Sequence, residues 1–299
     1  SPTQRHTKYC FASPQALRWV DNDGKFHLRP FVYGLKSTRD LDTFELKFTT
    51  DHKQIYPVYF VVRGAPYKLL GVVETDLHLF GALDKQAPLF LFGTDRLGRD
   101  LLSRIIYGAQ ISLSIGLVGV FLSYILGLML GGVSGYYGGT VDTIIQRIVE
   151  MIQVFPTIPL WLALSAAIPS NWSQTKVYFA IVVILSFVGW TSLARVVRGK
   201  LLSLRDEGFV TAARLAGASS GYLIRRHLLP SFTSHIIVAI TLSIPGMILG
   251  ETSLSFLGLG LQAPAISWGV LLREAQNVQT VALHPWLMMP VFFVIAVVL

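Results

Sequence analysis

DEGFVTAARLAGASSGYLIRRHLLPS, residues 206–231, is a basic, helix-forming stretch that lies between two long apolar runs. Seven Lys and Arg residues fall between Arg195 and Arg226. Because loops rich in Lys and Arg beside apolar spans stay on the cytoplasmic side of a membrane, the stretch is predicted to be cytoplasmic. A membrane protein that keeps such a segment at the membrane surface is expected to offer it to a partner.

The composition is that of an integral membrane protein. Hydrophobic residues make up 52% of the 299 positions and charged residues only 14%, with a mean hydropathy of +0.55. This is too apolar for an ordinary soluble domain, so the lipid bilayer is the first predicted partner. The net charge of +8 would also fit nucleic acid, but the clustering of positive charge beside apolar runs favours membrane orientation. We therefore expect no nucleic-acid partner. The single Cys10 allows no intrachain disulfide.

Several apolar segments approach the length of about 20 residues that a bilayer-crossing helix needs. The last of them has 15 residues, so it is either a short or tilted span or part of a longer one. The segments are residues 111–133, 143–168, 177–197, 232–249 and 285–299.

The orientation of these spans follows from the basic cluster. If residues 200–231 are cytoplasmic, counting back through the spans places residues 135–142 inside and residues 1–92 outside the cell membrane. No segment of residues 1–92 is apolar enough to carry it across. We therefore expect a further transmembrane helix before Ser1, giving six spans, with a cleaved signal peptide as the alternative.

Residues 1–92 are predicted to form a small β-rich region. Residues 44–50 and 55–63 are rich in aromatic and β-branched residues and are predicted to be short strands. Turns are expected at Asp51, Pro57, Gly64 and Pro66. The region is either a cap that docks another protein or a long folded loop.

One face of the first span carries only small residues, four positions apart. Such a face lets another helix approach closely, which is how helices associate in lipid. The approaching helix belongs either to this chain or to a partner subunit. The residues are Gly119, Ser123, Gly127, Gly131 and Gly135.

Prolines and carboxylates interrupt the apolar runs. Pro156, Pro159 and Pro245 remove backbone hydrogen bonds and are expected to bend helices, as suits a path that opens and closes. Glu150 is expected either to pair with Arg147 one turn away or to contact substrate or a gate. Glu251 is predicted to close its span at the outer face, near the mouth of a path or as an interfacial carboxylate.

The basic stretch at residues 206–231 is predicted to form two helices. Ser203 followed by Asp206 matches an S-x-x-D capping signature for a helix over residues 204–216, which Gly217 would end. A second helix begins at Ser219 or Ser220, and Pro230 stops or redirects it. Binding of DNA by such a helix-turn-helix is disfavoured between two spans, whereas binding of lipid headgroups stays open.

The stretch resembles the EAA loop of ABC importer permeases, whose pattern is EAA, three residues, G, nine residues and I-x-LP. Thr211 stands where Glu is usual and His227 where Ile is usual. The resemblance implies that this coupling loop, residues 200–231, contacts an ATPase. The residues that it implies for this contact are Asp206, Glu207, Thr211, Ala212, Ala213, Gly217, Ala218, His227, Leu229 and Pro230.

Three further segments, residues 93–113, 135–142 and 251–272, are similar to the dipeptide, oligopeptide and nickel permease family, in its second, C-type subunit. The resemblance implies an all-α polytopic membrane protein with the type I ABC importer permease fold and a small β-rich extracytoplasmic region. The expected domains are residues 1–92, a pre-span segment at 93–110 and the permease domain at 111–299.

The resemblance also implies the assembly. Its parts would be a homologous second permease subunit, two cytoplasmic ATPases that bind ATP and Mg, and an extracytoplasmic solute-binding protein, in a bacterial or archaeal plasma membrane. The chain carries no G-x-x-x-x-G-K-[ST] sequence. We therefore expect no catalytic residue, metal or cofactor in it. Peptides lead as solutes, followed by nickel and small glycans; an ion-coupled secondary transporter and a membrane scaffold are the alternatives.

Overall fold

The computed structural model describes residues 2–39, 46–69, 73–82 and 89–298, which form two compact units. The first unit is Ser1–Gln110 with Leu271–Val297, and the second is Ile111–Val270 with Val298–Leu299. The residues near the carboxyl end thus group with the N-terminal region, which the expected boundaries at 92 and 110 did not include. The Trp286 Nε1 donates to the Thr94 carbonyl at 3.1 Å, and the His284 ring stacks on Phe11.

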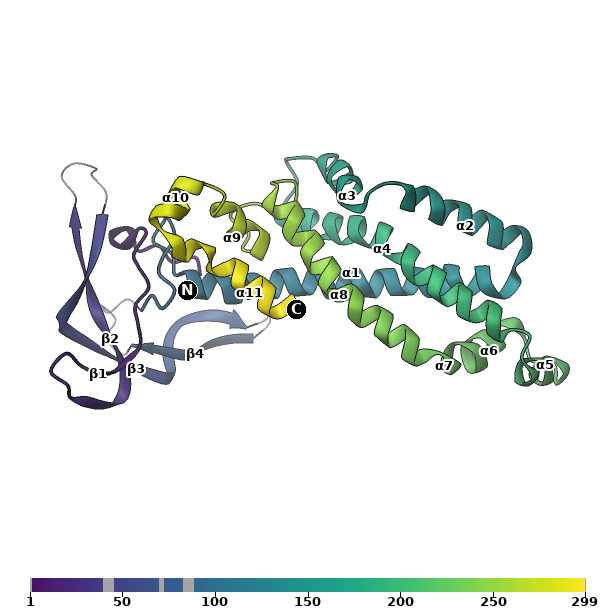
Figure 1. Ribbon diagram of the computed structural model, residues 1–299, viewed down its shortest axis with the longest axis horizontal. Helices are drawn as coiled ribbons and strands as arrows, with labels where there is room; N and C mark the ends of the chain where they lie inside the picture. The colour runs from purple at the N-terminus through teal and green to yellow at the C-terminus, as the bar shows by residue number, and fades with distance from the viewer. Residues whose placement is uncertain (1, 40–45, 70–72, 83–88, 299) are drawn as a thin grey trace. The chain divides into compact units, whose positions relative to one another are not determined.

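The first unit contains a four-stranded antiparallel sheet in the order β1-β2-β3-β4 (Figure 1). The two predicted short strands are one long strand, β3. The turns expected at Asp51, Pro57, Gly64 and Pro66 are wrong, because all four residues lie inside it. Pairing to β2 continues on both sides of Asp51, so the extra residues are absorbed as a bulge where the register shifts between Tyr33 and Gly34. The residue Phe44 lies outside the described residues. The strands are Arg18–Val20, Phe26–Arg39, Leu46–Leu69 and Val73–Ala82.

The remaining elements of the carboxyl end are short helices. They are α9 (Trp268–Glu274), α10 (Val278–Leu283), a 3₁₀ turn (Pro285–Met288) and α11 (Met289–Val298). The fifth predicted span therefore corresponds to a shorter apolar helix, Pro285–Val298.

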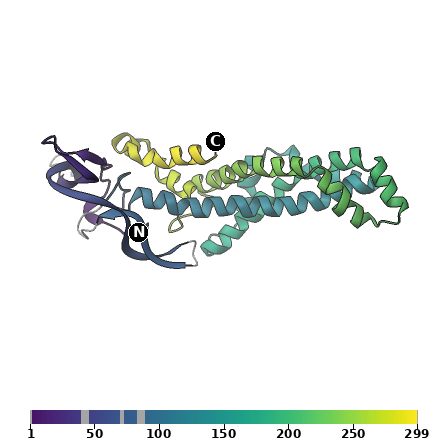
Figure 2. The ribbon, with the colours of Figure 1, turned by 90° about the horizontal axis from the view of Figure 1, so that it is seen from below.

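Three long apolar helices, each long enough to cross a membrane, form the second unit, which contains the first of them from Ile111 on (Figures 1 and 2). They are α1 (Leu101–Tyr137), α4 (Gln174–Leu204) and α8 (Thr233–Phe256). A fourth crossing is possible if α2 (Gly139–Val154) and α3 (Thr157–Ala166) count as one span. Within the described residues the structure thus has three or four such spans where the sequence predicted five.

The predicted bend at Pro156 is present. The helices α2 and α3 meet at 86°, and Pro156 lies between them at the N-cap of α3, with Pro159 in the first turn. Because proline has no N–H and restricts the residue before it, Phe155 adopts an extended conformation and ends α2 there.

The helix α4 packs against the small-residue face of α1. A Cβ added at Gly127 would lie 2.9 Å from the Leu193 Cβ, and one at Gly131 would lie 2.5 Å from the Ala194 carbonyl oxygen. At Gly135 the nearest atom is the Leu201 Cβ, at 2.8 Å. Of the two partners that the sequence left open, the structure shows the one within the chain. The same face continues at Ser123, whose hydroxyl donates to the Ser186 carbonyl, and at Gly119.

Candidate functional site

The first helix of the basic stretch, α5 (Gly208–Leu215), begins later than predicted. The helix α4 continues to Leu204, and the Ser203 hydroxyl donates to the Lys200 carbonyl inside it at 2.9 Å. The expected cap at Ser203 is therefore wrong. The burial of Leu201 in the core favours continuation of α4 over a new start, so local capping chemistry was overridden by packing.

The turn at Gly217 forms as predicted, by the geometry of a Schellman motif. The Gly217 N–H donates to the Arg214 carbonyl at 3.0 Å, and the Ala218 N–H donates to the Ala213 carbonyl at 3.1 Å. Gly217 has a φ of +84°, in the left-handed region that a residue with a Cβ adopts only under strain. The direction of the second helix therefore depends on this glycine.

The second helix begins at a serine cap and widens before Pro230. The Ser219 hydroxyl accepts from the Tyr222 N–H at 3.4 Å at the start of α6 (Ser220–Leu223). A π-helical turn, Ile224–Leu228, leads into α7 (Leu229–Ser231). Since Pro230 cannot donate a hydrogen bond and its ring crowds the preceding turn, a widened turn accommodates it and the chain stays helical to Ser231.

These helices form the hairpin, residues 208–231, and a buried apolar cluster holds them to the long helices. Val210 of α5, Leu223 of α6 and Leu228 are all fully buried. They pack with Leu201 of α4 and Ile236 of α8. The hairpin is therefore packed against α4 and α8 through a shared apolar core.

The outer surface of the hairpin is open and lined by small residues. A concavity of about 540 Å³ lies at the turn, and Tyr222 packs edge to face against His227 beside it. Leu215 protrudes next to it, 85% exposed. The concavity is lined by Ala213, Ala216, Gly217, Ala218, Ser219, Tyr222 and His227.

The structure brings part of the predicted contact set to this concavity. Ala213, Gly217, Ala218 and His227 line it. The other predicted contact residues lie close to these in the sequence. Leu229 is half-buried, and the rest are exposed, namely Asp206, Glu207, Thr211, Ala212 and Pro230.

An ion pair that the sequence analysis missed braces the same end of the unit. Arg198 of α4 holds Asp142 of α2 through two bonds, Nε to Oδ1 and Nη2 to Oδ2, both 2.5 Å. The Ser134 hydroxyl also donates to Asp142. This bidentate pair joins the turn between α1 and α2 to α4, six residues before α4 ends at Leu204. The signal was present, since both residues flank predicted cytoplasmic segments.

The carboxylates of the apolar runs have different surroundings. Glu150 is exposed and pairs with Arg147 at 2.8 Å, which is one of the two roles predicted for it. Glu251 is fully buried, and α8 continues past it to Phe256, so the predicted end of the span at Glu251 is wrong. Pro245 lies inside α8, which continues through it.

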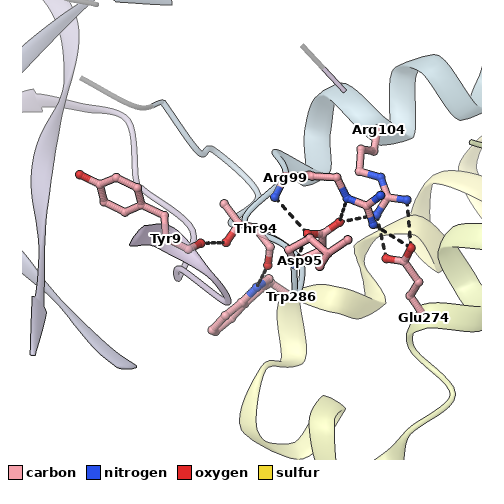
Figure 3. Close-up of polar contacts among 8 residues, drawn as sticks. Tyr9, Thr94, Asp95, Arg99, Arg104, Glu274 and Trp286 are labelled. Atoms are coloured by element: carbon pink, nitrogen blue, oxygen red, sulfur yellow. Dashed lines mark hydrogen bonds and ion pairs between the residues drawn. The ribbon is translucent and has the colours of Figure 1, made fainter. Parts of the chain in front are cut away.

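A second polar cluster, also missed from sequence, lies in the first unit (Figure 3). Arg104 is buried and bonds Asp95 at 2.5 Å and Glu274 at 2.7 Å, and Arg99 bonds the same two carboxylates. Asp95 also accepts the N–H groups of Leu97 and Arg99, which folds its own loop around it. Arg104, from the segment at residues 93–113, thus contacts Glu274, which lies 170 positions further along the chain.

The neighbouring Asp100 directly precedes α1. Its carboxylate accepts the Ser103 N–H at 2.9 Å, as an N-cap does, while burial raises its pKa above the usual value. Across the described parts of the chain, no three His, Cys, Asp or Glu side chains come together as they would to hold a metal ion.

Comparisons with known proteins agree with this architecture. Residues 123–299 match the family described as binding-protein-dependent transport system inner membrane component. The chain is 38% identical over 205 residues to a dipeptide transport system permease protein, DppC, of Bacillus subtilis; the match covers 68% of this chain and 62% of that relative. It is also 38% identical to an oligopeptide transport system permease protein, OppC, of Haemophilus influenzae, over 74% of this chain and 68% of the relative.

Among solved structures, an inward-facing MetNI methionine ABC transporter has a similar fold. The TM-score is 0.51 at 18% identity, with 66% of this chain and 92% of that chain covered. The chain therefore belongs to the binding-protein-dependent transport system inner membrane component family and has the type I ABC importer permease fold.

Proposed function

We propose that the chain is the transmembrane permease subunit of an ATP-driven, binding-protein-dependent importer of di- or oligopeptides. The hairpin carries this proposal, because it offers an open, small-residue concavity on a rigid base inside a chain of this family. The solute class is supported by the dipeptide and oligopeptide names of the two relatives.

The proposed assembly has this chain and a homologous second permease forming the path in a bacterial or archaeal plasma membrane. Two cytoplasmic ATPase subunits bind ATP and Mg and contact residues 200–231, and a solute-binding protein delivers peptide on the outer side, where residues 1–92 lie. This chain itself needs no cofactor and performs no catalysis.

The proposed mechanism is mechanical coupling through the hairpin. A side chain of the ATPase enters the concavity beside Gly217, where the small side chains of Ala213 and Ala216 leave room for it. When the ATPases close on ATP, the hairpin moves as a body, since Leu223 and Leu228 lie in the cluster shared with α4 and α8. Those two helices then tilt and change access to the path.

Replacing Gly217 with Val tests the proposal, measured as ATPase co-purification and peptide uptake in vesicles. A Cβ at Gly217 has open space around it, so the change acts through backbone strain and by filling the concavity. Gly24→Val is a matched control, since Gly24 also has a positive φ (+78°) and open space, but lies in the turn between β1 and β2. We expect Gly217→Val alone to lose both signals, and equal behaviour of the two variants would refute the docking role.

A further inference from the structure

The carboxylate of Glu251 is the centre of a buried hydrogen-bond network at the far end of α8. Its Oε2 accepts from the Ser112 hydroxyl of α1 at 2.8 Å, and its Oε1 accepts from the Ser255 hydroxyl at 2.8 Å. Both hydroxyl oxygens in turn accept backbone N–H groups, from Trp268 at 3.1 Å and Leu261 at 3.0 Å. A hydroxyl has one hydrogen to donate, so Glu251 orients both serines to receive the segment that follows α8.

This segment, residues 257–268, is seated closely on the helix that precedes it. A Cβ added at Gly260 would lie 2.6 Å from the Ser255 hydroxyl oxygen. One at Gly269, just beyond the segment, would lie 2.5 Å from the Thr252 carbonyl oxygen. Leu261 is buried in the cluster that contains Ile115 of α1 and Ile181 of α4, so the segment covers one end of the apolar core of the unit.

The bonds to Glu251 are of a kind that a small movement can break. The bonds from Ser112 and Ser255 to Glu251 are directional, and such bonds fail once a shift of one helix separates the donor from the acceptor. A buried carboxylate held by hydroxyls is costly for stability alone, since an apolar side chain would pack there without desolvation. The Glu251 carboxylate is better suited to holding residues 257–268 in a fixed position from which they can be released.

The helix α8 connects this network to the hairpin. It begins at Thr233, directly after Phe232, whose ring is buried in the cluster that anchors the hairpin. Its 24 residues span about 36 Å, so Glu251 lies about five turns from the hairpin on one continuous helix. A tilt of α8 driven from the hairpin therefore displaces Glu251 relative to Ser112 of α1.

We propose that Glu251 is a positioning residue that holds residues 257–268 as the closing segment of the bundle, at the end of α8 remote from the hairpin, and releases them when α8 tilts. This inference rests on the proposed transport function. In this proposal residues 257–268 form a gate on the outer side, and Glu251 holds that gate closed.

The test uses membrane vesicles that contain the chain with its partner permease, ATPases and binding protein. In a Cys10→Ser background, Ala265→Cys reports release of the segment through its rate of labelling by a membrane-impermeant maleimide. Glu251→Gln keeps the volume but leaves one serine without an acceptor, and Ser255→Ala removes the contacts to Glu251 and Leu261 together. Ser243→Ala is the control on the same helix, because its exposed hydroxyl bonds only its own helix at Ala239.

We expect both network variants to label about tenfold faster, the equivalent of losing about one hydrogen bond, and to hydrolyse ATP without the binding protein. A purely structural defect would lower assembly and ATPase activity instead. Wild-type labelling rates in an assembled Glu251→Gln complex would overturn the inference; should that variant not assemble, the labelling rate of Ser255→Ala decides in the same way. A wild-type complex without binding-protein-dependent ATP hydrolysis would refute the proposed function itself.

Discussion

At its first turn α8 follows a hairpin with an apolar interior and an open outer surface, whereas near its last turn it carries Glu251 in a sealed polar network. The apolar cluster at the hairpin is non-directional, and in the proposed mechanism it lets the hairpin move as one body with α4 and α8. The hydroxyl network is directional and fails once donor and acceptor separate. One end of the helix thus adjoins an open surface, and the other carries a buried polar network.

The largest effect should come from disrupting the close contact between α1 and α4. Gly131→Leu places a side chain against the Ala194 backbone, which cannot yield without moving α4. We expect overpacking of about 1–3 kcal/mol or more and loss of the folded bundle, measured by thermal stability in detergent. Gly132→Leu is the neighbouring control, because nothing lies within 4 Å of its Cβ position. Equal stability of the two variants would show that α1 and α4 do not approach as described.

A smaller effect, confined to the hairpin end, is expected for Asp142→Asn. It removes the charge-assisted bidentate pair with Arg198, worth about 1–2 kcal/mol for a partly exposed pair. Peptide uptake should fall while labelling of Ala265→Cys stays unchanged. Arg198→Lys should be intermediate, because an ammonium keeps the charge without the planar fork. Faster labelling in Asp142→Asn would show that this pair between α2 and α4 also helps to hold residues 257–268 in place.

The smallest effect is expected for Glu150→Gln in α2. Its pair with Arg147 is exposed, and such pairs contribute less than about 0.5 kcal/mol. Uptake and thermal stability should both match the wild type. A loss of uptake at unchanged stability would show that Glu150 contacts the solute or a partner, the second of the two roles that its sequence position allowed.

Local chemistry made part of the hairpin predictable from sequence. The turn at Gly217 and the cap at Ser219 depend on residues within a few positions of each other, and both formed as predicted. The start of the first helix was mispredicted because the burial of Leu201 extended α4 through the capping signal at Ser203. The sequence predicted two strands in place of β3 for a similar reason. Pairing with β2 continues the strand past Asp51, where a turn was expected.

Local sequence patterns could not predict the two polar clusters, because their members are far apart in the chain. Arg104 and Glu274 are 170 positions apart, and Ser112 and Glu251 are 139 apart. Arg104, Ser112 and Glu251 lie in segments that resemble the permease family, and Glu274 lies just beyond one, but spacing within a segment does not show which side chains meet. The small-residue face of α1 was visible from its period of four, whereas its partner, α4, required the three-dimensional structure.

Coupling between the hairpin and the ATPase is tested most directly by photo-crosslinking from the hairpin in the assembled, transporting complex. A photoreactive amino acid replaces Leu215, which is 85% exposed beside the concavity, and in a second variant it replaces Leu28, which is 91% exposed on β2. We expect a crosslink from position 215 to the ATP-binding subunit and none from position 28. An active complex in which position 215 captures no ATPase, or in which both positions capture it equally, would contradict the claim that the hairpin couples ATP hydrolysis to transport.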